Sequence, residues 1–139
     1  MRKWEVNVTR IEAWTETLND EEYDHLIAAL EQLEEHGPVT RRPFVDTLEG
    51  SKHANMKELR PRATSEGAHM RVLFAFDLQS RAIMLVAGNK AGNWKRWYTD
   101  NIPIADALFT EHQDRLRAAA IGRPKPKRKA MKPRKGKNR

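Results

Sequence analysis

The sequence of 139 residues contains no cysteine. This absence excludes disulfide bonds, zinc sites with thiolate ligands and a cysteine nucleophile. No run of about 18 uninterrupted apolar residues is present, and the first residues lack the apolar core of a signal peptide. The length leaves room for only one ordinary domain. Because the sequence shows neither a membrane-spanning run nor a signal peptide, we expect this domain to be cytoplasmic.

The generic motifs of several enzyme classes are also missing. The sequence has no P-loop, no dinucleotide-binding glycine pattern, no GxSxG nucleophile turn and no HExxH metal motif. Its five histidines are scattered, and no two of them stand at the spacing of metal ligands. We therefore expect neither a catalytic metal nor a cofactor.

Positive charge is distributed unevenly along the chain. The formal net charge is +7, but residues 122–139 hold ten Lys and Arg and no acidic residue. Residues 1–50 carry 12 acidic and 5 basic side chains, whereas residues 51–100 carry 9 basic and 4 acidic ones. The middle of the chain is therefore the part that would bind a polyanion. The Lys/Arg/Pro segment 122–139 has too few apolar residues to fold, and we expect it to be disordered beyond a domain of residues 1–121.

The spacing of apolar residues predicts one long helix over Thr15–His36. Asn19 or Asp20 can cap its start, and Gly37-Pro38 ends it. The opposite face is acidic, which fits either simple solvation or a partner-binding surface. The apolar stripe of this helix comprises Tyr23, Leu26, Ile27, Leu30 and Leu33.

Four strands are predicted, and the last three are expected to pair in sequence as antiparallel neighbours. In the third strand the even-numbered apolar residues fall on one face and Arg71 on the other. The fourth strand is apolar on both faces, which is typical of a central strand. The stretch 37–53, with its prolines and glycines, is expected to be irregular. The predicted strands cover residues 4–9, 56–60, 69–77 and 81–88.

After Gly88 the sequence predicts a loop or a short helical turn over residues 89–98. Pro103 fits the first position of a final helix that runs to about Ala120. His112 lies on the apolar stripe of this helix, where a packed core histidine is more common than a catalytic one. The stripe comprises Leu108, Phe109, His112 and Leu116.

Basic and aromatic residues gather in the predicted strands and in the loop that follows them. Fixed cations can hold a phosphodiester and stabilise the charge of a pentacoordinate transition state. Aromatic rings can stack on an unpaired base. This composition favours phosphate or RNA binding; the alternative is that the aromatics only pack and the cations are only solvated. The cluster comprises Lys57, Arg60, Arg71, Lys90, Trp94, Lys95, Arg96, Trp97 and Tyr98.

Five short segments follow one another in an order and spacing that is specific for one protein family. They are Glu58-Leu59-Arg60, Arg71–Asp77, Leu85–Trp94, Trp97-Tyr98 and Ile102–Asp106. Together they resemble the RelE/ParE superfamily of toxins and, within it, the HigB-like (phage Gp49-like) branch of type II toxin–antitoxin systems. The resemblance extends from about Trp4 to Leu116.

The resemblance implies a compact α+β fold, in which a small antiparallel sheet packs against N-terminal helices and a C-terminal helix. It also implies a ribosome-dependent mRNA interferase, an endoribonuclease that uses the 2′-OH of the RNA as nucleophile without a metal. The implied partners are a helix-turn-helix antitoxin, mRNA on the ribosome, and operator DNA only through the antitoxin complex. The basic tail either holds ribosomal RNA by counterion release or is an unspecific solvated terminus.

The resemblance also implies roles for individual residues. Arg71 matches the strand arginine that contacts the scissile phosphate, and Lys90 matches the basic residue after the next strand. Arg60 matches the arginine that closes the earlier strand, and Tyr98 matches an aromatic near the cleavage site. On physical grounds, Arg71 and Lys90 would neutralise the phosphate and stabilise the transition state. The expected RNA-binding residues are Lys57, His53, Trp94, Lys95 and Arg96. The general base stays open between His53, Glu58 and Lys57.

The same superfamily offers two alternative hypotheses for the function. One is a ParE-like toxin that binds DNA gyrase and performs no chemistry, and the other is a degenerate member that only binds a partner. Many relatives carry successive basic residues where this chain has Lys90-Ala91-Gly92, so the site is expected to hold less positive charge here.

Overall fold

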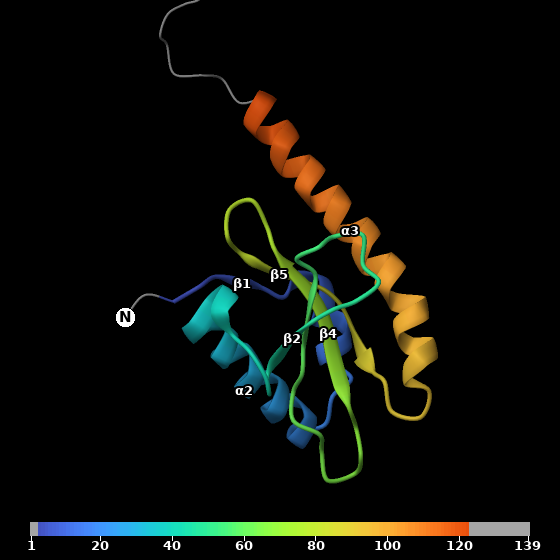
Figure 1. The fold of residues 1–139 in the computed structure, drawn as a ribbon. Helices are drawn as coiled ribbons and strands as arrows, with labels where there is room; N and C mark the ends of the chain where they lie inside the picture. Colours follow the sequence, from blue (N-terminus) through green and yellow to red (C-terminus); the bar gives the residue numbers. More distant parts are fainter. Residues whose placement is uncertain (1–2, 123–139) are drawn as a thin grey trace, which may run out of the picture.

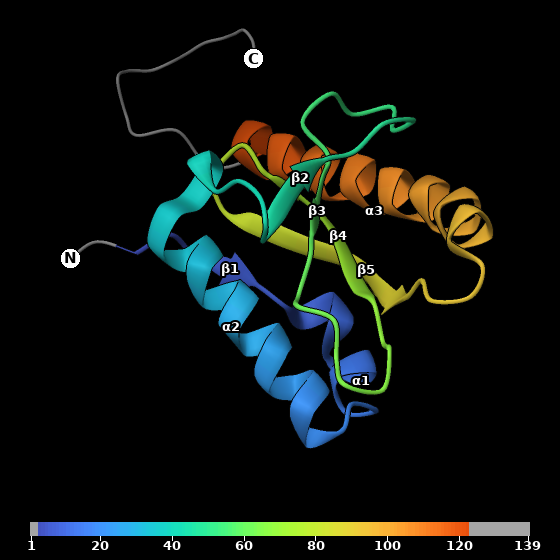
Figure 2. The same ribbon diagram turned by 60° about the horizontal axis from the view of Figure 1, so that its bottom comes forward.

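The computed structural model describes residues 3–122, which form a five-stranded sheet with a helical layer on each face (Figures 1 and 2). The strands lie in the order β1-β5-β4-β3-β2, and all neighbours are antiparallel except β1, which runs parallel to β5. The predicted α+β class is therefore confirmed, and the basic tail beyond Gly122 lies outside the described residues. The strands are β1 (Val6–Asn7), β2 (Val45–Thr47), β3 (Lys57–Leu59), β4 (Met70–Phe76) and β5 (Ala82–Asn89).

Helix α2 (Asp20–His36) covers one face of the sheet, and Asn19 caps its start as predicted. The Asn19 side chain accepts a hydrogen bond from the Glu22 main-chain N–H at 2.8 Å, and the Glu22 carboxylate accepts one from the Asn19 N–H at 2.9 Å. Tyr23, expected in the apolar stripe, is 48% exposed instead. The core under α2 contains Ile11, Leu26, Ala29, Leu33, Val45, Leu59, Val72, Phe74, Ala82 and Met84.

Replacing Asn19 by alanine is expected to lower the free energy of unfolding by about 1 kcal/mol, because the first turn of α2 then loses a hydrogen-bond acceptor. Urea unfolding at pH 7 measures this change. Asn19→Asp is the matched control, since a carboxylate keeps the acceptor and favours the positive end of the helix dipole. An equal loss in both variants would contradict the capping role.

Helix α3 (Trp94–Gly122) covers the other face. Even-numbered residues of β4 face α2 and odd-numbered ones face α3, as the alternation in the sequence predicted. Arg71 has the same parity as Leu73, so it belongs to the α3 side of the sheet. The core under α3 contains Met56, Leu73, Ala75, Ile83, Leu85, Ala105 and Phe109.

The helical region near the N-terminus is divided, in contrast to the single predicted helix from Thr15. The chain forms a 3-10 turn, η1 (Thr9–Ile11), and a short helix, α1 (Glu12–Thr15), before α2 begins at Asp20. The hydroxyl groups of Thr15 and Thr17 each donate to a main-chain carbonyl three residues earlier. These local bonds compete with helix continuation and end the first helix.

The stretch 37–53 is more regular than predicted, because it contains a 3-10 turn, η2 (Gly37–Val39), and the edge strand β2. Val45 of β2 lies opposite Leu59 of β3, and both side chains are buried in the core under α2. Three residues are too few to give a periodic signal, so this strand is decided by tertiary packing. The strand predicted over residues 4–9 is shorter than expected and comprises only the two residues of β1.

Helix α3 begins at Trp94, so the predicted helix start at Pro103 is wrong. Residues 94–98, which lie in the stretch predicted to be a loop or a short helical turn, form the first part of α3. The Asn93 side chain accepts from the Arg96 N–H at 3.3 Å and supports the earlier start. Pro103 lies inside the helix, where it cannot donate to the carbonyl of Thr99. Side chains on both sides of the proline hold α3 against the sheet, namely Trp97, Tyr98, Ala105 and Phe109. Although α3 has 29 residues, no helix within residues 3–122 is apolar enough over a sufficient length to cross a membrane.

Candidate functional site

Glu58 is an acidic residue surrounded by basic ones. It occupies the middle of β3, and its side chain is only 7% exposed. Its Oε1 accepts a hydrogen bond from the Tyr98 hydroxyl at 2.5 Å, and its Oε2 accepts one from Nη1 of Arg60 at 3.1 Å. The carboxylate is thus held between an aromatic hydroxyl group and a guanidinium group.

Close packing of α3 on β5 brings Tyr98 to this carboxylate. Gly88 lies under the neighbouring Trp97, and a Cβ at position 88 would stand 2.5 Å from the indole Nε1. Only glycine leaves room for this approach. Burial, and then the hydrogen bond and charge of Glu58, raise the pKa of Tyr98 to about 12. Tyr98 therefore remains a hydrogen-bond donor at neutral pH.

Arg71 lies in β4, opposite Gly88, with its side chain 7% exposed. Its Nη1 donates to the Met70 carbonyl at 2.7 Å, and its Nε lies 3.8 Å from Oε1 of Glu58. Within residues 3–122 this Nε has no hydrogen-bond partner. Burial, and then the charge of Arg60, lower the pKa of Arg71. A buried cationic donor without an acceptor is suited to bind an anionic oxygen.

Lys90 follows β5 and faces two aromatic rings of α3. Its Nζ lies 5.4 Å from the ring centroid of Tyr98 and 5.9 Å from that of Trp94. Burial, and then the charge of Arg71, lower the pKa of Lys90, which makes its ammonium group a better proton donor. Trp94 is 53% exposed and offers a free ring surface beside this cation.

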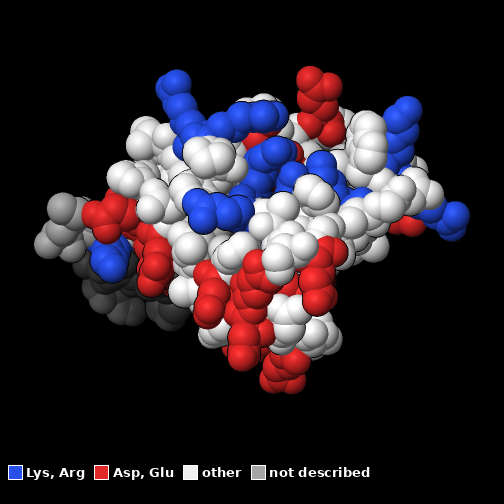
Figure 3. Space-filling view, turned by 90° about the horizontal axis from the view of Figure 1, so that it is seen from below, with Lys and Arg blue, Asp and Glu red and all other residues white. Residues whose placement is uncertain are grey.

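Most of these residues line one open cleft of about 450 Å³, which we call the catalytic cleft after the reaction that we propose for it below. The end of β2 and the loop after it form one wall, and the first part of α3 forms the other. Figure 3 shows Lys and Arg side chains gathered over the upper part of one face, with Asp and Glu side chains along its lower part. The cleft is lined by Thr47, Leu48, Glu49, Glu58, Arg60, Lys90, Trp94, Tyr98 and Ile102.

Five of the predicted site residues do not line this cleft, namely the buried Arg71, the exposed Lys95 and Arg96, and His53 and Lys57. His53 shares a hydrogen bond between its Nε2 and the Thr110 hydroxyl at 2.8 Å and packs its ring against Phe109. Lys57 is adjacent to Glu58 in β3, so its side chain belongs to the opposite face of the sheet. It lines a different cleft beside β2. Of the three general-base candidates, only Glu58 lines the catalytic cleft.

The predicted RNA-binding residues at the start of α3 are exposed at the rim. Nζ of Lys95 lies 5.6 Å from the ring centroid of Trp94, and Nε of Arg96 lies 3.5 Å from a carboxylate oxygen of Asp100. Neither side chain lines the catalytic cleft. The structure thus brings Arg60, Arg71, Lys90, Trp94 and Tyr98 together and leaves His53, Lys57, Lys95 and Arg96 outside.

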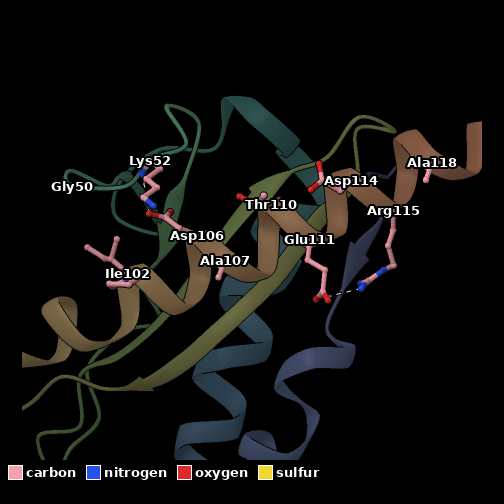
Figure 4. A pocket seen from close by; sticks show the side chains of 11 residues that line it. Gly50, Lys52, Ile102, Asp106, Ala107, Thr110, Glu111, Asp114, Arg115 and Ala118 are labelled. Carbon is pink, nitrogen blue, oxygen red and sulfur yellow. Dashed lines mark hydrogen bonds and ion pairs between the residues drawn. The ribbon is translucent and has the colours of Figure 1, made fainter. Parts of the chain in front are cut away.

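Asp106 anchors one wall of the cleft to α3, a role that the sequence alone did not indicate. This buried carboxylate accepts hydrogen bonds from the Ser51 hydroxyl at 2.5 Å and from the Lys52 main-chain N–H at 2.9 Å. Figure 4 shows Asp106 of α3 beside Lys52 of the loop between β2 and β3, within an open groove of about 780 Å³. The loop that ends one wall of the catalytic cleft is therefore tied to the helix that forms the other wall.

A third buried carboxylate, Asp77, serves the fold. It accepts from Nε2 of His112 at 2.8 Å and from Nη2 and Nε of Arg81 at 2.9 and 3.1 Å. The main-chain N–H groups of Gln79 and Arg81 also donate to it. His112 is therefore a buried, hydrogen-bonded residue, as its place on the apolar stripe predicted.

The described residues contain no group of three or more acidic or histidine side chains that could hold a metal ion.

The catalytic cleft combines a carboxylate that can accept a proton, a cation that can donate one, and further fixed positive charge. Arg60 and Lys90 line the cleft, and Nε of the buried Arg71 lies 3.8 Å from Oε1 of Glu58, which also lines it. Such an arrangement can bind a phosphodiester and stabilise the additional negative charge that develops during its cleavage. The exposed ring of Trp94 can stack on a base next to that phosphate.

Comparison with known proteins identifies the family. Residues 13–110 match the family described as "Phage derived protein Gp49-like". The chain is 48% identical over 129 residues to the Mycobacterium tuberculosis protein described as "Putative toxin HigB2" and 50% identical over 108 residues to "Putative toxin HigB3" of the same organism. The first alignment covers 93% of this chain and 61% of HigB2, and the second covers 74% of this chain and 91% of HigB3.

No solved structure matches this chain. The family match nevertheless spans β2 to β5 and the first part of α3, which together supply every residue of the catalytic cleft. The chain therefore belongs to the Gp49-like family of phage-derived proteins, in the HigB-like branch of the RelE/ParE superfamily.

Proposed function

We propose that this protein is the toxin of a type II toxin–antitoxin pair and that it cleaves mRNA on the ribosome without a metal. The observation that carries this proposal is the set of Glu58, Arg60, Arg71, Lys90 and Tyr98 around one cleft. The toxin names of two relatives that are 48% and 50% identical support the first part. Its partner would be a small helix-turn-helix antitoxin, through which alone the pair would bind operator DNA.

The proposed reaction is an internal displacement at phosphorus. Glu58 takes the proton from the 2′-OH of the RNA, and the 2′-oxygen forms a bond to phosphorus as the bond to the 5′-oxygen breaks. Lys90 gives a proton to the departing 5′-oxygen. The products are a 2′,3′-cyclic phosphate and a 5′-hydroxyl group, and no external nucleophile is consumed.

The remaining residues would orient these groups and neutralise charge. Arg60 and Arg71 would bind the non-bridging oxygens of the phosphate, where their charge counts most in the pentacoordinate transition state. Tyr98 donates a hydrogen bond to Glu58 and so fixes the direction of the carboxylate. Trp94 would stack on a base beside the scissile bond.

Replacing Lys90 by alanine is expected to reduce the cleavage rate by about 10²–10³-fold, because the transition state loses both a cation and a proton donor. We would measure new 3′ ends by primer extension on a defined mRNA in stalled ribosomal complexes, with naked mRNA beside them. Cleavage by the unmodified protein should persist in EDTA.

Arg62→Ala is the matched control, because Arg62 is exposed in the loop after β3 and lines neither the catalytic cleft nor any other cleft named here. It removes the same charge and should leave the rate unchanged. Intact mRNA with the unmodified protein bound to the ribosome would refute the proposed nuclease. Supercoiling by DNA gyrase would then be assayed for inhibition, as the ParE-like alternative predicts.

A further inference from the structure

A second cleft lies beside the outer edge of β2. It measures about 500 Å³ and shares Thr47 with the catalytic cleft. We propose that this second cleft binds the phosphate backbone of the same single-stranded RNA, a short distance along the chain from the scissile phosphate. The inference rests on the proposed function and extends it to the RNA that flanks the cleavage site. The second cleft is lined by Pro38, Val39, Thr40, Arg41, Arg42, Val45, Asp46, Thr47 and Lys57.

The charges of the second cleft favour an anionic ligand. Three of its lining residues are basic and only Asp46 is acidic. Arg42 is engaged by Asp46, with a distance of 2.6 Å between Nη2 and Oδ2. Neither Arg41 nor Lys57 takes part in an ion pair with another residue of the part that the structure describes. Two cations are thus available for phosphate oxygens.

The basic residues of the two clefts act on one another electrostatically. Burial is the main cause of the lowered pKa of Lys90, and the charges of Arg71, Arg60 and Arg42 lower it further. Arg42 of the second cleft therefore acts electrostatically on a residue of the catalytic cleft. Likewise, the charge of Arg60 contributes to the lowered pKa of Asp46, after the larger effect of its hydrogen bond with Arg42.

The position of the second cleft selects nucleic acid over other anions. Thr47 is at the end of the short strand β2, so a chain that leaves the catalytic cleft across Thr47 enters the second cleft directly. A polymer with one negative charge per nucleotide would place successive phosphates in both clefts. Val39, which is 71% exposed at the rim, offers an apolar contact to a sugar or base.

The side chains to be tested can be removed without disturbing the local fold. Arg41 is exposed, and the turn at this point is held by its main-chain carbonyl, which accepts from the N–H groups of Phe44 and Val45. Lys57 pairs with its neighbours in the sheet through the main chain. Arg41→Ala/Lys57→Ala is therefore the test variant, and Arg41→Glu is a second variant that changes only an exposed side chain.

The experiment measures binding of RNA in which every 2′-OH carries a methyl group, so that it cannot be cut. Fluorescence anisotropy with the full-length chain gives the Kd of an octanucleotide and, by competition, of a trinucleotide between 50 and 200 mM salt. Arg62→Ala/Arg117→Ala removes two exposed charges outside both clefts and is the matched control.

The double variant Arg41→Ala/Lys57→Ala is expected to weaken octanucleotide binding by about tenfold or more and to reduce the slope of log K against log salt by about 1.4, because two phosphate contacts are lost. Binding of the trinucleotide should not change in the double variant. The control variant should bind both RNA lengths with the Kd of the unmodified protein. Arg41→Glu should weaken octanucleotide binding as well.

Two results would overturn the inference. One is a double variant that binds the octanucleotide like the control, and the other is an equal loss for both lengths. Displacement of the octanucleotide by an acidic peptide, dependent on Arg41 and Lys57 but without effect on the trinucleotide, would assign the second cleft to a protein partner instead. Because the RNA in this assay is never cut, failure of the inference is separate from failure of the Lys90→Ala cleavage test.

Discussion

Replacing Glu58 by glutamine is expected to slow mRNA cleavage by about 10²–10⁴-fold, the usual contribution of a general base. Glutamine has nearly the same shape and keeps an acceptor for the Tyr98 hydroxyl group. Its amide cannot take the proton of the 2′-OH. The loss should therefore appear in the chemical step and not in the binding of ribosomal complexes.

Single-turnover cleavage on stalled ribosomal complexes at pH 7 provides the test, with binding of the protein to the same complexes measured beside it. Glu58→Gln should bind these complexes like the unmodified protein while its single-turnover rate falls. Glu66→Gln, in the exposed loop between β3 and β4, is the matched control. A Glu58→Gln variant that cleaves at the normal rate would remove Glu58 from the mechanism.

The largest loss of stability is expected for Asp77→Ala, at about 3–5 kcal/mol. The Asp77 side chain is fully buried, and its removal leaves His112 and Arg81 without the carboxylate that joins them. The free energy of unfolding of small domains is about 5–15 kcal/mol, so this single change would remove a large part of it. Urea unfolding at pH 7 measures it.

The effect of Asp77→Ala should depend on pH in a defined direction. Burial alone would raise the pKa of Asp77, but the hydrogen bonds from His112, Arg81 and the main chain outweigh it, so the pKa lies below the ordinary value of 3.8. The stabilisation is therefore complete above about pH 4 and is lost as the pH falls through the lowered pKa of the folded state.

Unfolding measured at pH 7, 5 and 3 should accordingly show equal deficits at the first two values and a smaller one at pH 3. Asp114→Ala is the control, because within residues 3–122 Asp114 forms only an exposed ion pair with Arg117, worth about 1 kcal/mol or less. A deficit for Asp77→Ala as small as that of the control would contradict the role assigned to the buried carboxylate.

Long periodic segments were predicted well, because burial on defined faces leaves a regular pattern. The alternation over 69–77 gave β4 with its two faces, and the helical stripe gave α2. Strand β2 was not predicted, and the strand predicted over 4–9 forms only as the two residues of β1, since both depend on a partner strand rather than on their own residues. Pro103 misled the prediction of α3, because proline usually begins a helix, whereas here packing of residues on both sides carries the helix through it.

The candidate site was predictable only in part. The resemblance to a known family brought together Arg60, Arg71, Lys90 and Tyr98, which lie within distant segments of the chain; their catalytic roles stay predictions. Strand alternation could have separated Lys57 from Glu58, since adjacent residues point to opposite faces. The anchoring bonds of Asp106 had no signal in the sequence, because they join residues more than fifty positions apart.

The proline inside α3 separates two parts of the helix in which substitutions have different consequences during evolution. Before Pro103 the helix presents Trp94 and Tyr98 to the catalytic cleft, and after it the helix buries Phe109 and His112 in the core. Under the proposed function, Trp94 is the residue of the first part that can change the RNA preference without loss of core packing, because Trp97 and Tyr98 also pack against the core. Substitutions in the second part fall first on the fold, so the exposed first turn is where substrate preference can evolve with the least effect on stability.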